Sequence, residues 1–300
     1  MLSGKHIVFL GGDARQLEII KKCIDLRARV SLVGFDNLQN PFIEATNREL
    51  TPDLMKTVDV LILPIVGTDD RGNVESIFTK KTLVLTEELI EALPEQAVIY
   101  AGMAKPYLRY LCEKHGKRLV ELLERDDVAI YNSIPTVEGA LMMAIQNTDI
   151  TIHGSACIVL GLGRVGMTLA RTLHGLGAKV RVGVRQSELF ARAYEMGLTP
   201  FQIEELSDQV EDVDLLFNTI PALVVTSRVI AHMPHRAVII DLASKPGGVD
   251  FGYAEKRGIK ALLAPSLPGL VAPKTAGRIL AMTIVQDLSE QDGKGGKGER

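Results

Sequence analysis

Three glycines in the second half of the chain have the spacing that most clearly implies chemistry. Gly161, Gly163 and Gly166 form a G-x-G-x-x-G motif directly after the apolar run "ACIVL" and before a helical pattern. In a strand–turn–helix unit, such glycines allow a tight turn, let the backbone approach a pyrophosphate and let the helix pack closely on the strand. Amides at the start of the helix then face the phosphates. The motif therefore predicts a dinucleotide site.

Arg185 follows the next predicted strand, "KVRVGV", at the position where NAD enzymes usually carry Asp or Glu. A carboxylate there accepts hydrogen bonds from the ribose 2′-hydroxyl, whereas an arginine pairs with a 2′-phosphate. Gln186 and Ser187 add neutral donors, and Arg164 in the glycine turn adds a second cation. The sequence therefore predicts NADP rather than NAD, the alternative being that Arg185 is only a solvated loop residue.

Further cofactor contacts are expected at the turn after the strand "VDLLFN", which should lie against the nicotinamide ribose. The predicted cofactor-binding residues are Gly161, Leu162, Gly163, Arg164, Val165, Gly166, Arg185, Gln186, Ser187, Asn218, Thr219, Ile220, Pro221, Ala243 and Lys274. No metal site is predicted, because the three cysteines and six histidines lack metal-ligand spacing. The cysteines also lie too far apart to suggest a disulfide framework.

Four residues are predicted to contact an anionic substrate. Ser133 and Thr136 in "YNSIPT" are expected to begin a helix, where hydroxyls and free amides form an anion site, although capping alone explains them equally well. Lys245 follows a strand ending at Asp241 and could bind a carboxylate, act as a base if desolvated, or be a plain surface lysine. Lys274 in "APKTAG" lies at another predicted helix start.

A second glycine pair occurs in "FLGGDARQLEII" near the N-terminus, but no third glycine follows it. Asp13 and Gln16 have the spacing of a capping box, and a carboxylate at this position would repel a phosphate. We predict helix capping rather than a second nucleotide site, which leaves Arg15 or Gln16 to contact a substrate.

The elements that must position these residues follow from the hydrophobic pattern. Short runs rich in Val, Ile and Leu alternate with amphipathic stretches, which is typical of a parallel sheet with crossover helices. The predicted strands are "HIVFL", "RVSLVG", "VDVLILP", "AVIYAG" and "KRLVELL" in the first half, and "ACIVLG", "KVRVGV", "VDLLFN", "AVIIDLA" and "IKALLA" in the second. The fold class predicted is α/β, with two Rossmann-like, doubly wound parallel-sheet domains.

The predicted boundaries give a flavodoxin-like or Rossmann-like domain for substrate or partner at 1–132, a linker helix at 133–150 and a nucleotide-binding domain at 151–272. A helix at 273–290 is expected to pack back onto the first domain. The final segment, 291–300, has almost nothing to bury and is predicted to be a disordered tail.

Composition narrows the class of partner. The 300 residues are 46% apolar and 24% charged, as in a soluble globular protein with two cores. The net charge of −3 argues against nucleic acid or an anionic membrane as a partner, because both need a basic patch. The N-terminus lacks the apolar run of a signal peptide, and no stretch approaches the ~18 apolar residues of a membrane span. We expect a cytoplasmic protein.

Six segments together resemble the A subunits of bacterial dipicolinate synthase over nearly the whole chain. They are "GGDARQLEII", "ERDDVAIYNSIPTVEGA", "VLGLGRVGMTLARTL", "NTIPALVV", "DLASKPGGVDF" and "LLAPSLPGLVAPKTAG". The resemblance implies NADP-linked oxidation of a dihydrodipicolinate-type precursor, derived from 4-hydroxy-tetrahydrodipicolinate, to dipicolinate during sporulation. It also implies a dicarboxylate cyclic imine as substrate, a partner in the form of a flavoprotein-like B subunit, and a place in the cytoplasm of the mother cell.

Two alternatives stay open. "NTIP" and "VRQS" are similar to cofactor-binding segments of shikimate dehydrogenases, but the Ser-x-Ser element with which that family holds its acid is absent from the first domain. The chain could also bind NADP as a regulatory subunit without chemistry, because hydride transfer demands no side-chain nucleophile. Homo-oligomers are common among two-domain dehydrogenases, although the sequence identifies no interface.

Overall fold

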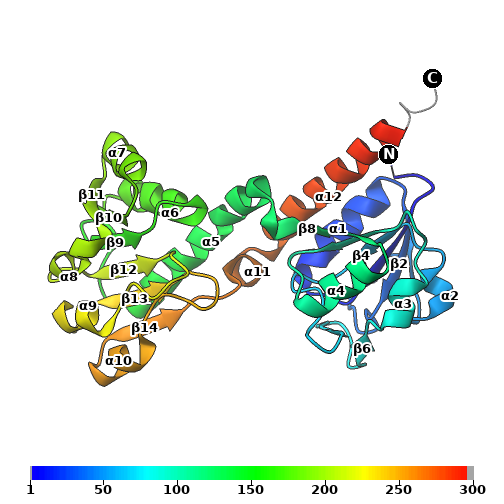
Figure 1. Ribbon diagram of the computed structural model, residues 1–300, viewed down its shortest axis with the longest axis horizontal. Helices are drawn as coiled ribbons and strands as arrows, with labels where there is room; N and C mark the ends of the chain where they lie inside the picture. Colours follow the sequence, from blue (N-terminus) through cyan, green and yellow to red (C-terminus); the bar gives the residue numbers. More distant parts are fainter. Residues whose placement is uncertain (1, 296–300) are drawn as a thin grey trace. The chain divides into compact units, whose positions relative to one another are not determined.

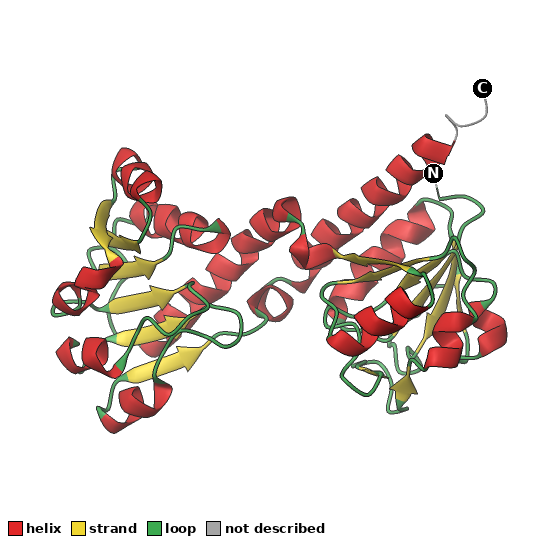
Figure 2. Cartoon of the chain, viewed as in Figure 1, coloured by secondary structure: helices red, strands yellow, loops and turns green. Residues whose placement is uncertain are grey.

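The computed structural model describes the backbone of residues 2–295 and the side chains of residues 2–291. The chain divides into two compact units, an N-terminal unit formed by the described parts of 1–129 and 272–300 and a C-terminal unit formed by 130–271. Each unit contains one six-stranded parallel sheet with helices packed on it (Figures 1 and 2). The predicted α/β class with two doubly wound sheets is confirmed.

The sheet of the N-terminal unit has the strand order β3-β2-β1-β4-β7-β8, with all neighbours parallel. Its strands are β1 (His6–Leu10), β2 (Arg29–Val33), β3 (Ala45–Asn47), β4 (Val60–Ile62), β7 (Val98–Ala101) and β8 (Arg118–Glu121). The other elements before the linking helix are α1 (Ala14–Asp25), α2 (Pro52–Met55), α3 (Glu87–Glu91), α4 (Pro106–Lys114), the 3₁₀ turn η1 (Leu122–Glu124) and the small hairpin β5 (Asn73–Val74) and β6 (Leu83–Val84).

The continuous apolar run of β1 has a simple cause, because both faces of the sheet are covered. Ile7 and Phe9 pack into one hydrophobic cluster, while Val8 and Leu10 pack into another. All four side chains are fully buried. A parallel strand with helices on both sides therefore needs apolar residues at every position rather than at every second one.

Helix α12 (Pro273–Gly295) packs against α1, so the last helix belongs to the N-terminal unit. Gly277 permits the close approach, because a Cβ there would run into the backbone carbonyl of Arg15. The prediction of a disordered tail from 291 is wrong for 291–295, which are helical. Gln291 Nε2 donates to Asp287 Oδ2 at 2.8 Å, a hydrogen bond one turn back that supports this extension. Residues 296–300 of the predicted tail lie outside the described residues.

The C-terminal unit repeats the same topology, with the strand order β11-β10-β9-β12-β13-β14. Its strands are β9 (Ala156–Leu160), β10 (Lys179–Val184), β11 (Thr199–Gln202), β12 (Leu215–Asn218), β13 (Val238–Asp241) and β14 (Lys260–Leu263). Its remaining elements are α6 (Arg164–Gly175), α7 (Ser187–Glu195), η2 (Ile203–Glu205), α8 (Leu206–Gln209), α9 (Ser227–His232), α10 (Phe251–Lys256) and α11 (Leu267–Val271). In both units the first strand lies at the centre, where the strand order reverses. In such sheets ligands bind at the carboxyl ends of the strands near this reversal.

Every predicted strand overlaps an observed one, but β3 and β11 were missed by the pattern. Both are edge strands. β3 is short and half exposed, and β11 contains Pro200, which cannot donate to a ladder and is tolerated at an edge. Edge strands carry too little apolar sequence to stand out from loops.

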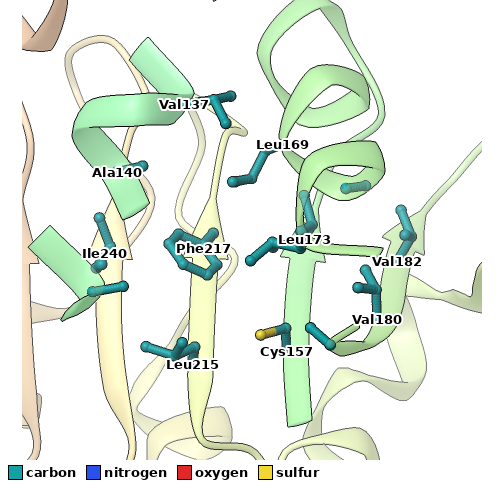
Figure 3. Close-up of a cluster of buried hydrophobic side chains, with 14 of the residues drawn as sticks. Val137, Ala140, Cys157, Leu169, Leu173, Val180, Val182, Leu215, Phe217 and Ile240 are labelled. Atoms are coloured by element: carbon teal, nitrogen blue, oxygen red, sulfur yellow. The ribbon is translucent and has the colours of Figure 1, made fainter. Parts of the chain in front are cut away.

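Helix α5 (Asp126–Asn147) connects the two units and corrects the predicted linker helix at 133–150. It begins seven residues earlier, where Asp126 and Asp127 suit the positive end of the helix dipole and Val128 is buried. By length and composition it is also the one described helix able to span a membrane. Its residues Val137 and Ala140 nevertheless pack into the core of the C-terminal unit with Leu169, Leu173 and Phe217 (Figure 3).

Candidate functional site

The glycine turn between β9 and α6 has the tight geometry that its motif predicts. Gly161 has φ +88°, and a Cβ there would lie 2.7 Å from Thr219 Oγ1. Gly166 packs so closely under the turn that a Cβ would run into the carbonyl oxygen of Gly161. Only glycine satisfies both constraints, because the first needs a left-handed backbone and the second needs no side chain.

Gly163 plays a different part, because nothing lies within 4 Å of the position where its Cβ would be. Gly163 is also the N-cap of α6, and no side chain caps this helix end. Arg164 and Val165 begin the helix, with amides that precede the first intrahelical acceptor. An open space beside uncapped helix amides fits the pyrophosphate of a dinucleotide.

Arg185 directly follows β10, as the sequence predicts, and its side chain is exposed. Gln186 is the N-cap of α7, and its side chain makes no capping hydrogen bond. Ser187, the first residue of α7, is exposed as well. The second strand of this sheet therefore ends in a cation and an uncapped helix end rather than in a carboxylate.

A buried pair of polar residues organises the next two turns. Asn218 and Asp241 end the adjacent strands β12 and β13, and both are fully buried. Asn218 Nδ2 donates to Asp241 Oδ1 at 2.8 Å. Asp241 also accepts from the amide of Ala243 at 3.1 Å and, through Oδ2, from the amide of Gly248 at 2.9 Å. One carboxylate thus fixes both ends of the loop 242–248.

The same network reaches the glycine turn. Thr219 Oγ1 donates to the carbonyl of Leu160, the last residue of β9, at 2.8 Å. The amide of Leu242 donates to the carbonyl of Asn218 at 2.8 Å, and Asn218 Oδ1 accepts from the amide of Ile220 at 3.1 Å. The turns after β9, β12 and β13 are therefore held together by hydrogen bonds. The sequence analysis missed this role of Asp241, although an acid inside the apolar run "AVIIDLA" is a usable signal.

Lys245 lies in the loop that Asp241 fixes, and its side chain is exposed. An exposed ammonium is well solvated, so the condition under which Lys245 was expected to act as a base, desolvation, is not met in this structure. Attraction of a substrate carboxylate needs no desolvation and stays a prediction.

Ser133 and Thr136 do not begin a helix, so the prediction of an anion site at a helix start there is wrong. Both lie inside α5, and each hydroxyl donates to a carbonyl of the preceding turn: Ser133 Oγ to Ile130 at 2.6 Å and Thr136 Oγ1 to Asn132 at 2.8 Å. The buried Ser133 Oγ also lies 2.7 Å from Thr168 Oγ1 in α6. Ser133 therefore supports the helix that follows the glycine turn.

Lys274 is exposed in the first turn of α12 and belongs to the N-terminal unit, while the glycine turn belongs to the C-terminal unit. Its place in the cofactor site stays a prediction. The capping box predicted at the start of α1 is confirmed, with both of its hydrogen bonds between Asp13 and Gln16 present. The Gln16 side chain is thereby used, while Arg15 forms an ion pair with Asp13.

The cysteines add no reactive thiol. Cys23, Cys112 and Cys157 are buried. Burial raises the pKa of Cys23 to about 12 and that of Cys112 to about 11. The thiolate, which is the reactive form, is therefore disfavoured at neutral pH.

Comparison with known proteins covers both units. The sequence profile of the N-terminal domain of the dipicolinate synthase A subunit matches residues 6–123. The profile described as "Alanine dehydrogenase/PNT, C-terminal domain" matches residues 132–296. The glycine turn and the second match agree that the C-terminal unit is an NAD(P)-binding domain of the dehydrogenase type, which makes the chain an oxidoreductase.

Similar proteins match over almost the full chain. The dipicolinate synthase A subunit of Bacillus subtilis (strain 168) is 50% identical over 297 residues, which cover 99% of this chain and 100% of the relative. The crystal structure of the dipicolinate synthase A subunit from Bacillus halodurans is 58% identical with a TM-score of 0.93, covering 96% of this chain and 99% of that one. The crystal structure of the same protein from Bacillus subtilis has a TM-score of 0.94 at 49% identity, covering 98% and 99%. At this identity and coverage, the chain belongs to the family of dipicolinate synthase A subunits.

Proposed function

We propose that the chain binds NADP in its C-terminal unit and oxidises a dihydrodipicolinate-type precursor to dipicolinate. The observation that carries the choice of NADP is Arg185, exposed at the end of β10 beside the uncapped start of α7. A guanidinium and helix amides are both suited to a 2′-phosphate, whereas an acid that would favour the 2′-hydroxyl of NAD does not stand at this position.

The other cofactor contacts follow from the turns of the same sheet edge. The amides at the start of α6, with the open space at Gly163, suit the pyrophosphate. The turn from Asn218 to Pro221 is assigned to the nicotinamide ribose, and its conformation is supported by the bond from Asn218 to Asp241. Ala243 follows Asp241 in the adjacent loop, and Lys274 is assigned here only through the family resemblance.

The oxidation removes two electrons and one proton from the ring. The bound nicotinamide accepts the hydride, which takes both electrons of one ring C–H bond. A ring proton leaves to solvent, and the pyridine ring of dipicolinate results. Because the product is aromatic, the step is strongly downhill, so orientation and carboxylate binding supply much of the catalysis. Lys245, exposed in the loop fixed by Asp241, is assigned to attract a substrate carboxylate.

We further propose that the chain acts with a second protein in sporulating bacteria. The relatives are named as one lettered component of dipicolinate synthase, and the family resemblance implies a flavoprotein-like B subunit. The N-terminal unit, which the first profile matches over residues 6–123, is assigned to substrate or to this partner. The proposed location is the cytoplasm of the mother cell.

The test is turnover of a freshly prepared precursor by the chain, alone and with the B subunit, followed at 340 nm with NADP or NAD. We expect NADPH to form, at least tenfold faster than NADH forms from NAD. Lys245→Met should raise KM for the precursor, while Lys256→Met, another exposed lysine of the same unit, should not. Binding of NADP with no NADPH formed in either case would instead identify a regulatory subunit.

A further inference from the structure

The N-terminal unit contains a cavity of about 290 Å³. It lies between the segments that follow β1 and β4, and its lining includes Gly12, Arg15, Ile65, Thr68 and Lys105. β1 and β4 are neighbours at the point where the strand order of this sheet reverses. Ligands of doubly wound sheets bind at the carboxyl ends of the strands at this point.

Thr68 marks this cavity as unfinished. Its side chain is 1% exposed, and its hydroxyl oxygen has no hydrogen-bond partner among the described residues. A buried hydroxyl without a partner is costly and uncommon, so it calls for a specific explanation. Rotation about χ1 exchanges the hydroxyl and methyl of a threonine, which can present this donor to a ligand in the cavity.

The charged residues of the lining favour an anion. Asp13 is occupied, because its two carboxylate oxygens accept from Nε and Nη2 of Arg15, which leaves the Nη1 donors outside this pair. Asp69 is occupied by the amides of Arg71 and Asn73 and by the Asn73 side chain.

A second cation stands at the edge of the cavity. Lys105 is the N-cap of α4, a nine-residue helix with no side-chain cap, and lies 3.7 Å from Asp70 in a long ion pair. The remaining acid of the lining, Glu75, is exposed. The donors that are not already used are therefore a hydroxyl, part of a guanidinium and an ammonium, which together suit a carboxylate.

We propose that this cavity binds a carboxylate of a single-ring dicarboxylate, through Thr68, Arg15 and Lys105. The identity of the ligand, the pyridine dicarboxylate formed by the reaction, rests on the proposed function. The volume is close to the lower limit of ligand pockets, about 300–1,000 Å³, which suits one ring and excludes a dinucleotide.

The test is calorimetric titration of the full-length, nucleotide-free chain with dipicolinate in metal-free buffer. Thr68→Val keeps the shape of the side chain and removes its donor, so dipicolinate should bind about tenfold more weakly, as expected for a lost hydrogen bond to a charged group. The matched control is Thr283→Val, which changes a buried threonine of the same unit whose hydroxyl donates to Ile279 at 3.0 Å. It should bind dipicolinate as the unaltered chain does.

A second pair of variants covers the case in which Thr68→Val does not fold. Lys105→Gln should weaken dipicolinate binding several-fold. Lys81→Gln should not, because Lys81 is an exposed lysine of the same unit that pairs with Asp36 at 3.3 Å and does not line the cavity. Picolinate, with one carboxylate, should bind more weakly than dipicolinate and show the same dependence on Thr68.

The outcomes separate this inference from the proposed function. If the chain forms NADPH from the precursor but dipicolinate binds equally well to the unaltered, Thr68→Val and Lys105→Gln chains, the cavity assignment is overturned and the function stands. If dipicolinate binds with the expected dependence on Thr68 but no NADPH forms, the cavity assignment stands and the function fails. Absence of dipicolinate binding to the unaltered chain also overturns the cavity assignment.

Discussion

Asn218 and Asp241, the last residues of neighbouring strands, are joined by a 2.8 Å hydrogen bond between two fully buried side chains. Through this pair, the turn assigned to the nicotinamide ribose and the loop that carries Lys245 become one structure. A buried carboxylate needs such partners, because an unsatisfied charge in the interior is expensive. The pair therefore links stability of the sheet edge to the geometry of the cofactor site.

Asp241→Asn should loosen the nicotinamide side of the site more than the adenine side. An amide nitrogen near Gly248 would face another donor, so the loop 242–248 loses one of its anchors. We expect NADP to bind about tenfold more weakly, while 2′,5′-ADP, which lacks the nicotinamide, binds within about threefold of the unaltered chain. Calorimetric titration with the two ligands measures the ratio.

Asp214→Asn is the matched control for this change. Asp214 accepts from the amide of Ala156 at 2.9 Å, at the amino ends of the same sheet. It should lower the free energy of unfolding without altering the ratio of the two dissociation constants. An equal loss of NADP and 2′,5′-ADP in Asp241→Asn would show that Asp241 serves only the fold.

Arg185→Asp should reverse the preference between the two nucleotides. The substitution removes a charge-assisted bond to the 2′-phosphate and adds repulsion, while an acid at this position suits the 2′-hydroxyl of NAD. We expect the dissociation constant for NADP to rise about 100-fold and that for NAD to change by less than about threefold. Equal losses for both would contradict the 2′-phosphate assignment.

Gly166→Ala should disrupt the glycine turn, because its methyl group would run into the carbonyl oxygen of Gly161. Overpacking of this kind costs about 1–3 kcal/mol of unfolding free energy, and the displaced turn should also lose NADP affinity. The control is Gly175→Ala in the same helix, where a Cβ meets nothing within 4 Å. It should stabilise the chain by about 0.5–1 kcal/mol in thermal unfolding and leave NADP binding intact.

Asp13 should make the N-terminal unit sensitive to acid. Burial raises the pKa of its carboxyl, but hydrogen bonds and the charge of Arg15 outweigh this, so the pKa is lowered overall. The stabilisation is therefore fully present above the unfolded-state value, near 3.9, and is lost as the pH falls through the lower folded-state value.

Asp13→Ala should consequently lose about 1 kcal/mol at pH 7, the usual cost of a missing N-cap, and the loss should shrink as the pH falls below about 4. Urea unfolding across this range measures it. Asp53→Ala is the comparison, because Asp53 is an exposed partner of Lys56 and such pairs contribute little. A constant difference between the Asp13 variant and the unaltered chain at every pH would rule out the ionised cap.

Local patterns predicted most of the fold and the cofactor turn. The apolar runs locate the central strands, and the glycine motif and the capping box each depend on residues within a few positions of one another. Ser133 shows where local pattern misleads: beside Pro135 it resembles a helix start, yet the helix begins at Asp126 and the Ser133 hydroxyl bonds backwards to Ile130. The hydroxyl of Thr68 depends on segments far apart in sequence, which no spacing rule reports.

The most direct measurement of the central proposal is the stoichiometry of one turnover under nitrogen. The chain with its B subunit is held in excess over the precursor with NADP present, and NADPH and dipicolinate are both quantified. Oxygen is excluded because a dihydropyridine ring can also lose its electrons to it. Oxidation through the site at Gly163 and Arg185 predicts one NADPH for each dipicolinate. Dipicolinate formed without NADPH would contradict it.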